Sequence, residues 1–152
     1  MCTSFMGELM TATHNFGTAP TRGTSAADTF KAALYLTTAT VNASTTAYSA
    51  TNEVSGTNYT AGGVSISGWN APTATNSSAT AGVAFTTPTA SITYTNVTLS
   101  TAFDCVLIYN STQSNKAVSV HTFGSQTITA GTFTLTMPTN NTTNALLRLA
   151  TT

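Results

Sequence analysis

The stretch FDCVLIYNSTQSNKAVSVHTFG, residues 103–124, decides the fold of this chain. Its two ends, 103–109 and 116–124, are rich in apolar and β-branched residues, which favour extended backbone. Between them, 110–115 contains only Asn, Ser, Thr and Gln, residues that are common in turns. The stretch therefore predicts an antiparallel hairpin.

Segments with the same alternation of apolar and polar residues lie on both sides of this hairpin. They predict further strands at 29–36, 64–69, 82–88, 90–99, 131–138 and 145–150. The first is expected to be half-buried, with Phe30, Ala32 and Leu34 on its apolar face. About eight short strands with Gly, Asn and Pro turns predict an all-β domain over 28–152, an antiparallel β-sandwich or jelly-roll-like barrel. The polar segment 37–63 is expected to be a long ordered loop with short strands, anchored by Tyr48, Val54 and Tyr59.

The N-terminal residues have a different period. Phe5, Met6, Leu9 and Met10 recur at helical spacing, Ser4 or Thr3 can cap the start, and Gly17 follows the end. A short helix over 4–16 is expected, within an N-terminal helical arm of residues 1–17. An isolated helix of this length is marginal in water, so its apolar stripe must dock on this domain or on a neighbouring subunit.

The most informative composition figure is the charge. Charged residues make up 5 % of the 152 residues, with four Lys and Arg balancing four Asp and Glu, against about 25 % in ordinary soluble domains. A free monomer usually keeps a net charge that opposes self-association. This chain is therefore expected to be part of an assembly, packed beside copies of itself or on a scaffold; a secreted protein with a Thr-rich coat is the alternative.

The same composition excludes several functions. Four scattered basic residues cannot neutralise a phosphate track, so direct nucleic-acid binding is not expected. No apolar run is long enough for a membrane helix, and the first residues do not resemble a signal peptide, so maturation in a cytoplasm is expected. Cys2 and Cys105 lack metal-like spacing and are expected to be reduced apolar fillers.

Candidate chemistry is sparse. If the hairpin closes about Thr112 and Gln113, Asp104 and His121 become cross-strand neighbours, and a hydrogen-bonded pair that fixes the register is favoured over catalysis. No metal site or cofactor is expected, and the chain is not expected to be an enzyme. Trp69 could stack on a sugar, but a core position at a strand end is favoured.

Four blocks carry a resemblance to a known family: DTFKAALYL (28–36), NEVSGTNYTAGG (52–63), the long block 90–124 and GTFTLTMPT (131–139). They resemble small structural proteins that are encoded among the head and tail genes of tailed bacteriophages, and the opening helix followed by HNF is similar too. The resemblance covers most of the chain and implies no catalytic residues.

The resemblance implies a structural protein of the virion, made in the host bacterial cytoplasm. A capsid decoration or cement protein is favoured, with the major capsid protein and copies of itself as partners, in a homo-oligomer for which a trimer is weakly preferred. A tail, collar or fibre-attachment component is the alternative, and a glycan-binding module a further one. The candidate interface residues are Phe5, Met6, Leu9, Met10, Phe16 and Trp69.

Overall fold

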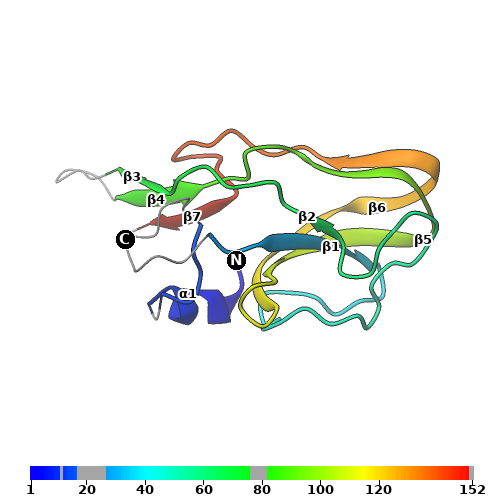
Figure 1. Ribbon diagram of the computed structural model, residues 1–152, viewed down its shortest axis with the longest axis horizontal. Coiled ribbons are helices and arrows are strands. Elements are labelled where there is room, and N and C mark those ends of the chain that lie inside the picture. Colours follow the sequence, from blue (N-terminus) through cyan, green and yellow to red (C-terminus); the bar gives the residue numbers. More distant parts are fainter. Residues whose placement is uncertain (11, 17–26, 76–81, 151–152) are drawn as a thin grey trace.

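The chain folds into two antiparallel sheets and one short helix. The computed structural model describes residues 1–10, 12–16, 27–75 and 82–150. Within these ranges the elements are α1 (Thr3–Met10), β1 (Phe30–Leu36), β2 (Val64–Ser65), β3 (Thr73–Thr75), β4 (Val83–Thr86), β5 (Ile92–Asn110), β6 (Lys116–Leu135) and β7 (Leu147–Ala150). The strand order is β2-β1-β5-β6 in one sheet and β3-β4-β7 in the other (Figure 1). The prediction of a predominantly β chain with antiparallel sheets is confirmed.

The predicted hairpin is present, but it is about twice as long as expected. β5 has 19 residues and β6 has 20, because 90–99 and 103–109 join into one strand and 116–124 and 131–138 into another. The register slips at several points, including between Leu99 and Phe103 and between Phe103 and Cys105. Such bulges bend a strand without ending it. This joining leaves seven strands in the described residues rather than about eight, and the added β3 lies in a segment for which the sequence predicts no strand.

The ribbon formed by β5 and β6 turns back over itself. Phe103 pairs with Gln126, yet its ring lies 5.2 Å from that of Phe133. Seven residues of straight strand would separate Gln126 from Phe133 by about 23 Å. The ribbon must therefore bend, and Figure 1 shows β6 curving back at one end where its colour changes from yellow to orange. The two halves of the ribbon form two layers with apolar side chains between them.

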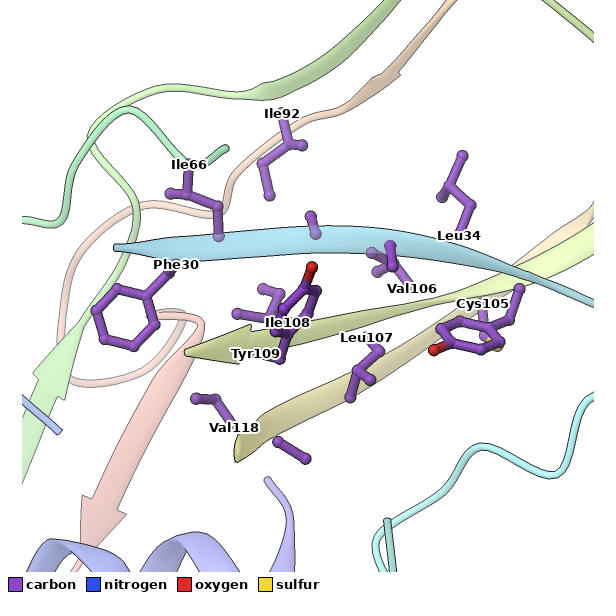
Figure 2. Packing of buried hydrophobic residues seen from close by; sticks show 14 of the residues in the cluster. Phe30, Leu34, Ile66, Ile92, Cys105, Val106, Leu107, Ile108, Tyr109 and Val118 are labelled. Carbon is purple, nitrogen blue, oxygen red and sulfur yellow. The ribbon is translucent and has the colours of Figure 1, made fainter. Parts of the chain in front are cut away.

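Strand β1 is buried on both faces, whereas the sequence predicted a half-buried strand. Ala33 and Tyr35, on the face expected to be exposed, are 0 % and 1 % exposed. The segment 37–63 covers this face: the Tyr35 hydroxyl donates to the Ser49 carbonyl, and the Tyr109 ring stacks on Tyr48 at 4.8 Å. Figure 2 shows the result, with buried side chains on either side of β1 and β5.

The helix ends earlier than predicted. Thr13 N–H donates to Glu8 C=O at 2.8 Å and Ala12 N–H to Leu9 C=O at 3.0 Å, while Ala12 has a φ of 52°. These two bonds with a left-handed residue are a Schellman motif, which terminates a helix. The motif normally uses glycine at the left-handed position, so Gly17 was the expected end and Ala12 gave no signal. Residues 12–16 are consequently free to return towards the sheet.

Two glycines let the segment 37–63 lie directly against the strands. An added Cβ on Gly63 would lie 1.7 Å from the Ala32 carbonyl oxygen, and Gly63 has a φ of 72°. An added Cβ on Gly56 would lie 1.9 Å from the Thr98 carbonyl oxygen. Both positions bring backbone against backbone, which only a residue without a side chain permits.

Replacing Gly63 with alanine should therefore destabilise the fold by about 3 kcal/mol or more, since a positive φ and a backbone clash act together. Gly124→Ala is the matched control, because a Cβ there meets nothing within 4 Å. Urea unfolding followed by tryptophan fluorescence measures both variants. Equal midpoints for the two variants would contradict the close contact of Gly63 with β1.

Candidate interaction surface

Two predicted interface residues of the arm, Phe5 and Phe16, belong with Trp69 to one aromatic cluster inside the chain. The Phe16 ring stacks on Phe30 at 4.6 Å and meets the Trp69 ring edge-on at 4.8 Å. Phe5 is 2 % exposed and Trp69 8 %, and Leu9 is half-buried against the same core. The side chains of Met6 and Met10 lie outside what the structure describes. The arm thus docks on its own chain here, and a role in contacts with other chains stays a prediction.

A polar network ties this arm to the hairpin. The Glu8 carboxylate accepts from Lys116 Nζ at 2.8 Å and bonds His14 Nε2 at 2.7 Å. The other ring nitrogen of His14, Nδ1, is 3.0 Å from the Asn110 amide nitrogen, which can only donate. His14 Nδ1 is therefore an acceptor, and the proton on Nε2 points at Glu8. Burial raises the pKa of Glu8, but the bonds from Lys116 and His14 outweigh it, so the pKa is lowered overall.

Asp28 extends the network to the start of β1. Its carboxylate accepts from the Asn110 amide at 2.7 Å, from Gln113 Nε2 at 3.2 Å and from the Asn15 backbone N–H at 3.0 Å. Asn110 is 0 % exposed, so its hydrogen bonds are made away from water, where an unpaired amide would be costly. One carboxylate therefore joins the arm, the first strand and the hairpin turn.

A third carboxylate, Glu53, anchors the long segment 37–63. It accepts from Tyr48 at 2.6 Å, from Tyr59 at 2.7 Å and from the Gly62 backbone N–H at 2.8 Å. Burial and then the hydrogen bond to Glu53 raise the pKa of both tyrosines. Burial also raises the pKa of Tyr109 to about 12. The predicted anchors Tyr48, Tyr59 and Val54, which is 4 % exposed, do hold this segment, although Glu53 was not foreseen as their partner.

These networks leave a surface with hardly any charge. Of the seven charged residues that the structure describes, Arg148 alone is exposed, the other six are half-buried, and none is fully buried. The Glu8 side chain is 13 % exposed and that of Lys116 39 %. Glu8, Lys116, Asp28 and Glu53 thus make contacts within the fold, and the described surface is largely hydroxyl, amide and methyl groups.

The predicted pairing of Asp104 with His121 is wrong. His121 lies opposite Val106, and Asp104 falls at the register slip between Phe103 and Cys105. His121 Nε2 instead lies 3.0 Å from the Ser119 hydroxyl, and Ser119 is 0 % exposed. In the described residues no carboxylate hydrogen-bonds this histidine, so the arrangement lacks the third member of a catalytic triad.

His121 lies in an apolar cleft between the two layers of the ribbon. The cleft has a volume of about 310 Å³ and is lined by Ile92, Val106, Ile108, His121, Thr122, Phe123, Gln126, Phe133, Thr134, Leu135, Thr136, Met137 and Leu146. Burial, and then the positive N-terminus, lower the pKa of His121 to about 4. The ring is therefore neutral at pH 7, and the cleft carries no charge. Sequence reasoning missed the cleft because it depends on the bend of the ribbon.

Both cysteines are free and buried, as expected of apolar fillers. Cys2 is 0 % and Cys105 4 % exposed. Burial raises the pKa of Cys2, and burial together with the charge of Asp104 raises that of Cys105 to about 11. Because the thiolate is the reactive form, both side chains are unreactive at neutral pH.

Removing the charge of Glu8 should loosen the arm. Glu8→Gln should lower the free energy of unfolding by about 1–3 kcal/mol, because hydrogen bonds to a charged acceptor are lost. Since the pKa of Glu8 is lowered on folding from 4.5, its contribution is complete above that pH and is lost as the pH falls below it. Urea unfolding across pH 7 to 3 measures this. An equally steep acid loss in the variant would contradict the assignment.

The His121 ring should titrate near pH 4 rather than 6.5, as measured by the NMR shift of its Cε1 proton. Because the unfolded chain takes up this proton at higher pH than the folded chain, His121 should reduce stability as the pH falls from 6.5 to 4. His121→Gln identifies the resonance and should remove this part of the pH dependence. A titration near pH 6.5 would show that water fills the cleft.

A metal-binding cluster and a membrane-spanning helix are both absent from the described residues. No group of three or more His, Cys, Asp or Glu side chains could hold a metal ion there, and none of the helices described is long and apolar enough to cross a membrane. Comparison with known proteins finds no matching family model, no matching curated protein and no matching solved structure.

Proposed function

We propose that this chain is a structural protein of a tailed-bacteriophage virion, and within the virion a capsid decoration or cement protein. The observation that carries the proposal is the neutral surface described above, in which Arg148 is the one exposed charged residue among those described and the other six are half-buried. The sequence resemblance to small virion proteins supports the same conclusion. The partners are the major capsid protein and further copies of this chain.

A neutral surface favours packing beside many other subunits. Burying a charged side chain in an interface costs desolvation energy unless it finds a partner, whereas hydroxyl and amide groups can exchange water for protein hydrogen bonds at little cost. A net charge of zero also removes long-range repulsion between crowded copies. A protein that worked alone would gain nothing from these properties and would lose solubility.

The fold proposed for this role is an antiparallel sandwich of the jelly-roll-like type. The two halves of the β5–β6 ribbon supply its layers, and Tyr94 ties them by donating to the Ala32 carbonyl of β1 at 2.8 Å. Hydrogen bonds of this kind between the layers make the domain rigid. A rigid domain can transmit mechanical force between the capsid subunits that it contacts. A flexible arm is not needed, because Phe5 and Phe16 are more stable in the core than exposed to water.

The action of the protein in this proposal is mechanical. Each copy bridges neighbouring major-capsid subunits through interfaces of about 1,600 Å², the usual size for stable contacts. The association free energy of many such contacts opposes the pressure of the packaged DNA. No catalytic step and no cofactor take part.

The alternatives make different demands on the molecule. A glycan-binding module would need Trp69 on the surface, but this ring is 8 % exposed and packed between Phe16 and Phe30. A tail, collar or fibre-attachment component would have the same neutral surface, and it differs from a decoration protein in copy number.

Quantitative mass spectrometry of purified particles of the phage that encodes this chain tests the proposal. A decoration protein should be present in roughly hundreds of copies, and a tail or collar component in roughly a dozen or fewer, following the symmetry of each site. Absence of the chain from the particles would refute both.

Rebinding to particles that lack the chain provides a matched control. At a temperature at which Gly63→Ala protein is unfolded and Gly124→Ala protein is folded, Gly124→Ala protein should co-sediment with them like the unaltered chain, whereas Gly63→Ala protein should not. Equal co-sedimentation of both variants would mean that the binding is non-specific.

A further inference from the structure

We propose that a second copy of this chain docks on the free edge of β6, over the apolar cleft, by antiparallel pairing of the two β6 strands about a two-fold axis. The inference rests on the assembly role proposed above and assigns the contact between copies to particular residues. It follows from the edge, its chemistry and the cleft beside it.

The outer edge of β5 in the β5–β6 ribbon is hydrogen-bonded to other segments, whereas most of the outer edge of β6 is not. On the β5 side, β1 pairs with the first layer, and Thr57 and Asn58 bond the second layer at Thr98 and Asn96. On the β6 side, Cys2 N–H donates to the Val118 carbonyl and Thr46 accepts from the Ala117 N–H. Residues 119–135 follow Val118 on the same strand. Within the described parts of the chain, their backbone–backbone hydrogen bonds are with β5 alone. β6 is thus the outer strand of both layers.

This open edge has few of the usual protections. Natural sheet edges carry lysine, proline or bulges that prevent pairing with other chains. Residues 117–135 contain no Lys, Arg, Asp, Glu or Pro, and His121 is neutral at pH 7. Bulges are present, but the register is regular over 119–122, opposite 105–108, and at 133–135, opposite 92–94. These two regular stretches can accept another strand.

The apolar cleft opens beside the same two stretches. Its lining includes His121 and Thr122 from the first and Phe133, Thr134 and Leu135 from the second. Thr122, Gln126, Thr134 and Thr136 are exposed around it. A strand paired with this edge would cover the cleft and remove its apolar lining from water, which adds to the free energy of backbone pairing.

A second copy is the occupant that meets these requirements. The partner must offer an extended strand whose backbone N–H and C=O groups are free to form hydrogen bonds. It must also carry no charged side chain that would be buried against the apolar cleft without an ionic partner. β6 itself is such a strand, and two identical edges related by a two-fold axis run antiparallel to each other. Because the edge is uncharged, the two copies meet without like-charge repulsion.

Sedimentation-velocity centrifugation of the purified full chain, over a range of concentrations, tests the inference. The unaltered chain should form dimers as concentration rises. The double variant Thr122→Lys and Thr134→Lys places positive charges on both stretches of the edge, and it should weaken dimerisation at least tenfold. Thr101→Lys, on an exposed position of β5, is the matched control and should leave dimerisation unchanged. Unfolding midpoints close to that of the unaltered chain establish that each variant is folded.

Hydrogen exchange measured by mass spectrometry locates the contact. Exchange at residues 119–122 and 133–135 should slow as the dimer forms. A chain that stays monomeric at every concentration overturns the inference, as does a closed trimer, a dimer that is insensitive to the edge lysines, or protection confined to another surface.

The experiments distinguish failure of the proposed virion role from failure of the proposed β6 edge contact. A dimer with the expected edge protection that is absent from phage particles refutes the virion role and leaves the edge contact standing. A chain that is abundant in particles but monomeric in solution, with no edge protection, refutes the edge contact alone.

Discussion

The structure depends on the bend in the β5–β6 ribbon. A straight two-stranded ribbon of this length would leave one of its faces in water, and an isolated hairpin is marginally stable at best. By turning back, the ribbon brings Phe133 against Phe103 and Tyr94 against the backbone of β1. One hairpin thereby supplies both layers around the core. The slips in register are the structural cause of the bend, because extra residues on one strand increase local curvature and twist.

Three carboxylates act as ties within the fold. Glu8 and Asp28 hold the arm and the hairpin turn, and Glu53 holds the long segment 37–63 through hydroxyl and backbone donors. Each carboxylate has at least two donors, which is the condition for placing a charge away from water without a large penalty. This arrangement leaves the three carboxylates only partly exposed, although none of them is buried. It also links the stability of the monomer to the neutrality of its surface.

Sequence reasoning found what local pattern encodes and missed what depends on distant contacts. Alternation of apolar residues was enough to predict the β class, β1 and the hairpin at 103–124. It could not predict that bulges would join four strands into two, because a bulge leaves no clear mark in composition. The position of His121 opposite Val106 follows from a turn centred on Gln113 and from a further slip between Ile108 and Tyr109, so the predicted pairing with Asp104 failed. Burial of both faces of β1 depended on Gly63 and the tyrosine anchors, which act across more than 20 residues of sequence.

The buried thiols have a consequence for where such a protein can work. Cys2 and Cys105 belong to the packing of the core, and their raised pKa values keep them in the thiol form. In the virion role proposed above, the protein would be assembled in a reducing compartment and later released into an oxidising one. A chain whose sulfur atoms are shielded from thiolate chemistry crosses that boundary with its covalent structure unchanged, and it neither cross-links to neighbours nor loses its shape on the way.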